Sequence, residues 1–184
     1  MSGVMTWIFL GGMGVLALVL FLYASFGLMF VFGAPWVPTS KKVARAMLKL
    51  AKVKKGDRVL DLGCGNGVIS ILAAKEFGAK STGLDIHPGL IWWARWRAWI
   101  GGVKTRTQFK RANLLKITLP KADIVTVYLL EGLMGSVRPI LVRDLDPKTC
   151  IVSHGFEFDG VQARQELSKQ GKTVYLYKVK DLKK

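Results

Sequence analysis

The chain has 184 residues, enough for one domain and a short appendage. Its 28 Lys and Arg residues against 12 Asp and Glu give a formal net charge of +16, and all of them lie at or after Lys41. This balance favours an anionic partner, which can be nucleic acid, an anionic membrane surface or an acidic protein. The two cysteines, Cys64 and Cys150, are too few to suggest a disulfide framework.

The amino-terminal segment carries no charge and is apolar or small from Val4 to Val37. This run exceeds the roughly 20 residues that span a bilayer, so we expect residues 5–32 to form one transmembrane helix. Trp7 and Trp36 occupy the positions expected of interfacial aromatic residues. A cleaved signal peptide would have a basic start and a shorter apolar run. The alternative is a buried helix of a soluble domain.

Basic residues follow this segment at Lys41, Lys42, Arg45 and Lys49. Because an excess of Lys and Arg marks the cytoplasmic side of a span, we expect the remainder of the chain to face the cytoplasm, or the matrix of an organelle. We therefore divide the chain into a transmembrane anchor with a proline hinge, residues 1–38, and a folded domain, residues 39–184.

The first helix of this domain is expected at residues 41–52, with Ser40 as its N-cap. One face of the helix is apolar and should pack on a sheet; it consists of Val43, Met47, Leu50 and Ala51. The basic residues fall on another face. We expect that face to lie along anionic lipid headgroups, the alternative being a face that is only solvated.

The chain is organised around an Asp-x-Gly-x-Gly-x-Gly run from Asp61 to Gly67. Residues 59–62 are typical of a buried parallel strand, and residues 68–75 of the helix that follows it. The alternating glycines let the backbone approach a ligand and aim free helix N–H groups at it. A dinucleotide fingerprint would need a third glycine at position 68, where the chain has Val68.

The remaining elements follow in the order of an α/β fold. We expect a strand at 80–86 that ends near Asp85, where a ribose-hydroxyl acceptor belongs in a nucleotide site. A helix from Pro88 to about Ile100 carries a stripe of Trp92, Trp96 and Trp99, which we expect to pack against the sheet or, alternatively, to touch a membrane interface. Further strands are expected at 105–111, 124–130, 148–156 and 173–179, a helix at 132–144, and a strand or short helix at 161–167.

The glycine run and the acid after the second strand resemble the cofactor site of class I S-adenosylmethionine (SAM)-dependent methyltransferases. This resemblance implies an α/β, Rossmann-like sheet that is mostly parallel with its last strand antiparallel, preceded here by the transmembrane helix. It implies SAM as the cofactor, with Asp61 near its amino-acid end and Asp85 at the ribose. Asn113 stands where many members have an Asp that contacts adenine, and it still offers a side-chain carbonyl. The implied cofactor-binding residues are Asp61, Gly63, Cys64, Gly65, Asn66, Asp85, Ile86 and Asn113.

A narrower resemblance covers roughly residues 33–179. The proline hinge at 35–39, the Trp- and Arg-rich segment 87–99 and the run 151–156 are similar to those of the membrane-anchored protein-lysine methyltransferases that modify the ATP synthase c-subunit or the adenine nucleotide translocase. This implies methylation of lysine ε-amines in a membrane or membrane-associated protein, by a single-pass enzyme in contact with the lipid bilayer. The oligomeric state is left open.

The end of the fourth strand bears on the substrate. Residues 128–131 are Tyr-Leu-Leu-Glu and not the Asn/Asp-Pro-Pro-aromatic tetrapeptide of base amino-methyltransferases, so no nucleic-acid partner is expected. Lysine must lose a proton before it can accept a methyl group, and Tyr128 would line an apolar site that favours the neutral amine. Glu131 would hold or deprotonate the amine, or else is a surface acid. Both assignments, Tyr128 and Glu131 as catalytic residues, are hypotheses.

The two histidines, His87 and His154, lack the spacing of a metal site, so no metal is expected, and His154 is more typical of a structural role. Since no separate substrate domain remains, the pocket should be shallow and open, as suits a protruding lysine side chain. Two alternatives stay open. One is a lipid-headgroup methyltransferase that acts at the bilayer surface, and the other is a SAM-binding membrane adaptor without activity.

Overall fold

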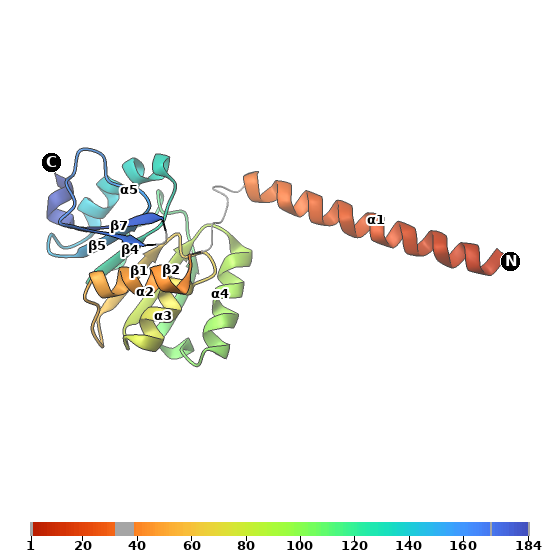
Figure 1. Cartoon of the computed structure of the whole chain (residues 1–184), viewed down its shortest axis with the longest axis horizontal. Coiled ribbons are helices and arrows are strands. Elements are labelled where there is room, and N and C mark those ends of the chain that lie inside the picture. Colours follow the sequence, from red (N-terminus) through yellow and green to blue (C-terminus); the bar gives the residue numbers. More distant parts are fainter. Residues whose placement is uncertain (1, 32–38, 170, 184) are drawn as a thin grey trace. The chain divides into compact units, whose positions relative to one another are not determined.

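The structure, a computed structural model, describes residues 2–31, 39–169 and 171–183. The chain divides into two units, one within residues 1–36 and one within residues 37–184. The first unit holds helix α1 (Ser2–Val31; Figure 1). Among the described residues, no helix combines the length and apolar character needed to cross a membrane. This finding does not support the transmembrane helix expected at 5–32, which stays a prediction, and the proline hinge at 35–38 lies outside the described residues.

The second unit is built on a seven-stranded sheet in the order β3-β2-β1-β4-β5-β7-β6. Its strands are β1 (Arg58–Leu62), β2 (Lys80–Asp85), β3 (Thr107–Arg111), β4 (Ile124–Val127), β5 (Cys150–His154), β6 (Gln165–Lys169) and β7 (Lys172–Lys178). The first five strands are parallel, and β7 runs antiparallel to both β5 and β6. This confirms the mostly parallel, Rossmann-like sheet with an antiparallel last strand. It also shows that the segment left open at 161–167 leads into a strand.

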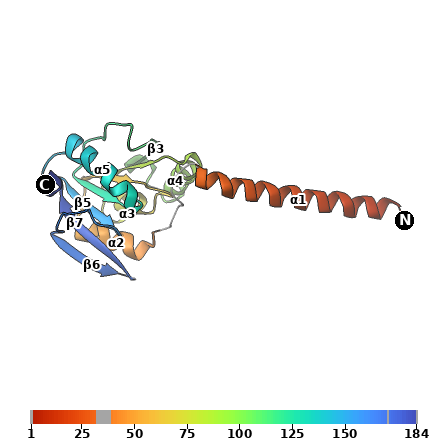
Figure 2. The same cartoon turned by 90° about the horizontal axis from the view of Figure 1, so that it is seen from above.

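Helices cover both faces of this sheet. One face carries α2 (Lys41–Leu50), α3 (Val68–Glu76) and α4 (Pro88–Ile100), and the other carries α5 (Glu131–Asp144), as the two views show (Figure 1, Figure 2). The alternation of side chains along β1 accounts for the two layers. Val59 packs with residues of α2 and α3, whereas Leu60 belongs to the larger cluster under α5. Two short 3-10 helices complete the unit, η1 (Lys104–Arg106) and η2 (Val179–Lys183).

Helix α2 begins as expected. The hydroxyl oxygen of Ser40 accepts a hydrogen bond from the Val43 N–H at 3.2 Å, which satisfies one of the free donors of the first turn. The face that packs is shifted from the expected one, because the buried residues are Val43, Ala44, Met47 and Leu48, while Leu50 and Ala51 are only half-buried. Helix α2 therefore covers the sheet with a slightly different stripe than the sequence pattern indicates.

Helix α4 corrects a second expectation. The tryptophan stripe expected to pack in the core is exposed, with 65% of Trp92 and 64% of Trp99 accessible to solvent. The buried residues of the helix are Ile91, Ala94 and Ala98. Small residues are buried here because α4 lies very close to the glycine turn. A Cβ added at Gly67 in that turn would lie only 3.0 Å from the Cβ of Ala94. A larger side chain on this face of α4 would not fit.

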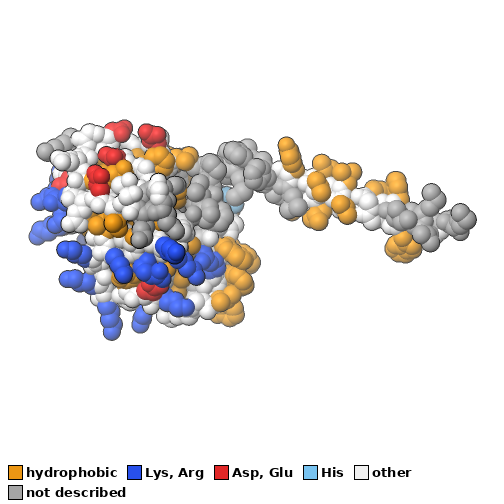
Figure 3. Space-filling view, in the orientation of Figure 1, with side chains coloured by type: hydrophobic (Ala, Val, Ile, Leu, Met, Phe, Trp, Pro, Cys, Tyr) orange, Lys and Arg blue, Asp and Glu red, His pale blue; other side chains and the backbone are white. Residues whose placement is uncertain are grey.

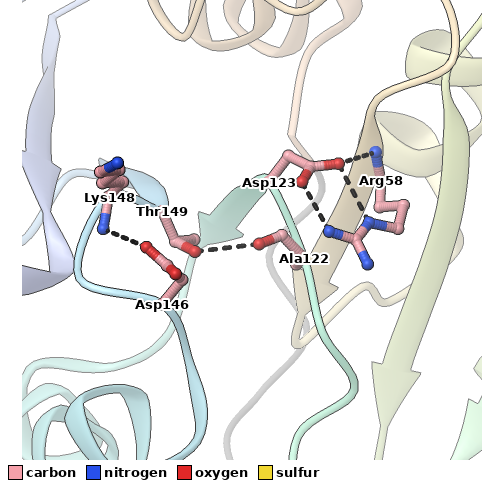
Figure 4. Close-up of polar contacts among 6 residues, drawn as sticks. All are labelled: Arg58, Ala122, Asp123, Asp146, Lys148 and Thr149. Atoms are coloured by element: carbon pink, nitrogen blue, oxygen red, sulfur yellow. Dashed lines mark hydrogen bonds and ion pairs between the residues drawn. The ribbon is translucent and has the colours of Figure 1, made fainter.

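At the amino ends of β1, β4 and β5, polar contacts join the neighbouring strands. Asp123, just before β4, accepts hydrogen bonds from the backbone N–H of Arg58 at 2.8 Å and from its guanidinium (Figure 4). The hydroxyl of Thr149 donates to the Ala122 carbonyl at 2.9 Å, which joins β4 to β5. The guanidinium of Arg58 lowers the pKa of Asp123. These contacts hold β1, β4 and β5 in register at their amino ends, which lie opposite the glycine turn.

Candidate active site

The glycine turn lies between β1 and α3, at the carboxyl ends of the parallel strands. The N–H groups of Gly63 and Cys64 both donate to the Leu84 carbonyl, at 2.9 and 3.0 Å, which bonds the turn to β2. Gly63, Gly65 and Gly67 have φ values of 71°, 52° and 76°, a region that other residues rarely adopt. A Cβ at Gly63 would also come within 2.6 Å of the Leu129 side chain. The run of glycines is therefore required by the backbone itself.

Asp85 joins the turn to the start of α4. One of its carboxylate oxygens accepts the Gly65 N–H at 2.8 Å, and the other accepts the His87 N–H, also at 2.8 Å. The carboxylate is half-buried, and each oxygen has a further lone pair that can accept a hydrogen bond. Ile86, 42% exposed, follows directly. A ligand that rests on the turn would meet an oriented carboxylate beside an apolar side chain.

Asp61 has a different environment from the one its motif suggests. It is 1% exposed, and its two oxygens accept hydrogen bonds from the hydroxyls of Ser70, at 2.9 Å, and Thr126, at 2.8 Å. Burial raises the pKa of Asp61 to about 6, against the lowering effect of the two hydroxyls. Asp61 thus braces β1 against α3 and β4 beneath the turn. Its expected role near the amino-acid end of the cofactor stays a prediction.

Two other residues of the turn act through their backbone. Cys64 is buried, and burial raises the pKa of its thiol, which disfavours the reactive thiolate. The carbonyl of Asn66 accepts a hydrogen bond from the guanidinium of Arg97 in α4, at 2.7 Å. Burial lowers the pKa of Arg97. Sequence reasoning missed this arginine, because nothing in the pattern of α4 distinguishes it from Arg95, which bonds the Phe109 carbonyl instead.

Asn113 lies near Asp85, since the N–H of the preceding residue, Ala112, donates to the Asp85 carbonyl at 2.8 Å. Its side-chain oxygen accepts the Leu115 N–H at 3.0 Å and closes a local turn after β3. The carbonyl expected to receive an adenine amino group therefore has a second, structural use. The adenine contact itself stays a prediction.

The strand ends beside the turn hold the candidate catalytic residues. Tyr128 follows β4, and its carbonyl would lie 3.5 Å from a Cβ at Gly63. The ring of Tyr128 contacts the ring of His154, at the end of β5, with centroids 4.2 Å apart. His154 is 3% exposed, whereas Glu131 is an exposed residue at the first position of α5. The structure therefore brings Tyr128 and His154 together next to the turn and leaves Glu131 exposed at the start of α5.

Within the described residues, no three His, Cys, Asp or Glu side chains cluster in a way that could hold a metal ion. The polar groups at the strand ends suit an organic ligand with hydroxyls instead. The Asp85 carboxylate can accept hydrogen bonds from a ribose, and the glycine turn leaves the backbone open to close approach. The residues present thus fit the nucleoside part of SAM.

The sheet order, its antiparallel β7 and the glycine turn held by Asp85 define a class I, Rossmann-like methyltransferase. The chain belongs to the family described as the ANTKMT methyltransferase domain, which matches residues 61–165. It is 38% identical over 148 residues to a protein-lysine N-methyltransferase of Saccharolobus islandicus, a match that covers 78% of this chain and 92% of that relative. It is 30% identical over 155 residues to the ATP synthase c-subunit lysine N-methyltransferase of Xenopus laevis, covering 81% of this chain and 68% of that one.

A solved structure supports the assignment as a SAM-dependent methyltransferase. The crystal structure of an RNA methyltransferase from Salinibacter ruber in complex with S-adenosyl-L-homocysteine superposes with a TM-score of 0.76 at 38% identity. The alignment covers 78% of this chain and 94% of that one. The present chain is therefore a SAM-dependent methyltransferase, and SAM is its cofactor.

Proposed function

We propose that the chain methylates the ε-amine of lysine in a membrane or membrane-associated protein. The observation that carries the proposal is the similarity to the protein-lysine N-methyltransferase of S. islandicus, which extends over nearly the whole of that relative. The Xenopus relative, whose name specifies lysine of the ATP synthase c-subunit, supports the same chemistry. The small size of the second unit is also compatible with lysine, because a protruding side chain does not need a separate substrate domain.

The proposed cofactor contacts combine the resemblance to class I methyltransferases with the geometry of the turn. Asp85 would accept the ribose hydroxyls with its remaining lone pairs, and the backbone of residues 63–66 would pack against the ribose and methionine parts. Ile86 would contact the adenine, with Asn113 at its edge. Asp61 would act from below, by holding the turn in place through Ser70 and Thr126. When bound, SAM supplies a methyl group on a positively charged sulfur, and displacement transfers that group to the amine nitrogen while the sulfur keeps the bonding electron pair.

The protein's part in the chemistry is to present a neutral amine. A lysine ammonium has a reference pKa near 10.4 and no lone pair to donate, so its proton must leave first. The aromatic pair of Tyr128 and His154 beside the turn provides a weakly polar surface that disfavours the charged form. Glu131, exposed at the start of α5, would accept or hold the proton as the amine enters. Positioning at the strand ends would supply most of the remaining acceleration.

We further propose that residues 5–32 anchor the enzyme in a membrane as a single-pass segment, with the catalytic unit on the cytoplasmic or matrix side. Two features of the sequence support this. No charged residue occurs before Lys41, and basic residues follow at once. The basic face of α2 would then lie toward anionic headgroups, and substrate and enzyme would meet at the bilayer surface.

The test is to incubate the purified full chain with radiolabelled SAM and membranes from its own source, and to separate lipid, protein and RNA before mass spectrometry. Methyl-lysine in a membrane protein is the expected product. Asp85→Ala should reduce the label at limiting SAM by about tenfold or more, whereas Asp57→Ala, just before β1 at the opposite end of the strands, should not. Label in small lipids would support the headgroup alternative instead. Label in RNA would agree with the name of the Salinibacter structure and would refute the lysine proposal.

A further inference from the structure

Helix α4 packs against the sheet with small residues and leaves its largest side chains outside. The exposed fractions are 65% for Trp92, 41% for Trp93, 41% for Trp96, 64% for Trp99 and 60% for Ile100. The rings of Trp93 and Trp96 stack on each other, with centroids 4.6 Å apart. We call these five residues the tryptophan face. In Figure 3 a hydrophobic patch covers the side of the second unit where Figure 1 labels α4.

Such a face is unusual, because soluble proteins rarely expose large contiguous apolar patches. Where such a patch does occur, it usually marks a site of interaction. Its tryptophan content suits two kinds of partner, a lipid bilayer and another protein. Tryptophan is the residue type most typical of the boundary between lipid tails and headgroups, since its ring is apolar and its N–H is polar. Protein–protein interfaces are also enriched in tryptophan, so the charge of the surrounding surface decides between the two kinds of partner.

The charges around the tryptophan face agree with a lipid partner. Between Asp85 and Asp123 every charged residue is a Lys or an Arg. This stretch includes α4, η1 and β3, and the exposed Lys104 and Arg106 come directly after the helix. Tryptophans flanked by exposed cations are complementary to a bilayer whose headgroups are anionic, where each cation near the surface contributes about 1 kcal/mol.

We propose that the tryptophan face of α4 binds the surface of an anionic lipid bilayer. The proposal concerns the second unit alone and goes beyond the proposed function, because it needs neither the activity nor the anchor. It has a consequence for both. Helix α4 begins at the His87 N–H held by Asp85, and Arg97 holds the Asn66 carbonyl of the glycine turn. A bilayer bound to α4 would therefore lie beside the cofactor site.

The six tryptophans of the chain make a direct test possible. Apart from Trp7 and Trp36, all of them are in α4, so the full chain with Trp7→Phe and Trp36→Phe fluoresces from this helix alone. The protein is mixed with vesicles of phosphatidylcholine with or without phosphatidylglycerol, and flotation measures how much is bound. Lipids brominated on the acyl chain then quench any tryptophan at the interface, and acrylamide quenches any tryptophan in water.

The expected result is strong quenching by brominated lipid and little by acrylamide in the anionic vesicles. Charge reversal by Lys104→Glu with Arg106→Glu should weaken the lipid quenching. The matched pair Lys180→Glu with Lys183→Glu, exposed in η2, changes the net charge equally and should not. Raising the salt from 0.1 to 1 M shortens the screening length from about 10 to about 3 Å and should reduce quenching in the same way as charge reversal.

Three outcomes would overturn the proposal. Bound protein quenched by acrylamide but not by brominated lipid would leave the anchor intact and place α4 in water. Bound protein quenched by neither would mean that the face is covered by another part of the chain or by a second copy. Protein that does not float at all would refute both this proposal and the anchor. Flotation that is lost on charge reversal would support the α4 contact while refuting the anchor.

Discussion

The buried carboxyl of Asp61 gives the structure a quantitative test. Burial raises the pKa of Asp61 from 3.8 to about 6, so the folded protein binds this proton more tightly than the unfolded chain does. A raised carboxyl pKa opposes folding once the pH exceeds the unfolded pKa of 3.8, because the carboxyl then ionises more readily in the unfolded chain than in the native state. The stabilisation that this bound proton provides is complete below the unfolded pKa of 3.8. It decreases between the two pKa values and does not change further above about pH 6. Stability should therefore be lost as the pH rises through this window.

The size of the effect follows from the shift. At about 1.4 kcal/mol per pKa unit, the wild-type free energy of unfolding should fall by about 2–3 kcal/mol relative to Asp61→Asn between pH 4 and pH 7. Asparagine keeps the shape and can still bond both hydroxyls if one of them turns to accept. Comparing the two proteins cancels the general acid destabilisation expected of a chain with a net charge of +16.

The assay is urea unfolding followed by circular dichroism at several pH values, with Asp144→Asn as a control of opposite sign. The guanidinium of Arg143 lowers the pKa of Asp144, so that carboxylate stabilises the fold above its unfolded pKa and loses the effect as the pH falls. The stability difference between wild type and Asp144→Asn should then grow as the pH rises to the unfolded carboxyl pKa of 3.8 and stay nearly constant from pH 4 to pH 7. A difference for Asp61→Asn that is flat from pH 4 to pH 7 would refute the buried, proton-binding carboxyl.

Three further substitutions test the turn. Gly67→Ala should destabilise the fold by about 1–3 kcal/mol, because the added Cβ would lie 2.8 Å from the Phe109 ring and the residue has a φ of +76°. The control is Gly135→Ala in α5, where the added Cβ meets open space. It should leave the melting temperature unchanged or raise it. Asp85→Ala should weaken SAM binding by about tenfold or more in calorimetry, and an unchanged Kd would contradict the assignment. Arg97→Ala should raise KM for SAM more than it lowers kcat, because it frees a turn carbonyl without touching the amine; equal effects on both would contradict a positioning role.

The glycine turn and its link to Asp85 could be predicted because their signals are local. The glycines and Asp85 act through their own backbone or through neighbours on adjacent parallel strands, and their spacing fixes the turn. The mostly parallel sheet with an antiparallel last strand was predicted through the family resemblance that this motif carries, whereas the order of the strands was not. Asp61 shows the limit of this reasoning. The motif places a carboxylate under the turn, but its partners Ser70 and Thr126 are 9 and 65 positions away, and no local pattern indicates them.

Helix α4 shows a second limit, in which the pattern itself is ambiguous. Two sets of residues lie at helical spacing, Trp92 with Trp96 and Trp99, and Ile91 with Ala94 and Ala98. Apolar periodicity favours the larger set for the core, and that expectation was wrong. The choice depends on how closely the helix approaches the turn, which is a property of the assembled fold. Arg97 could not be foreseen for the same reason.

The close approach of α4 also connects its two surfaces. Small residues on the inner side let the helix lie near enough for Arg97 to reach the turn carbonyl, and the same arrangement directs the tryptophans outward. The position of the turn and the exposure of the tryptophan face therefore have one structural cause. If the face binds lipid as proposed, substitutions that thicken the inner side, such as Ala94→Leu, would disturb cofactor and bilayer contacts together. Substitutions confined to the outer side, such as Trp92→Gln, would separate them, by weakening lipid binding while SAM affinity stays unchanged.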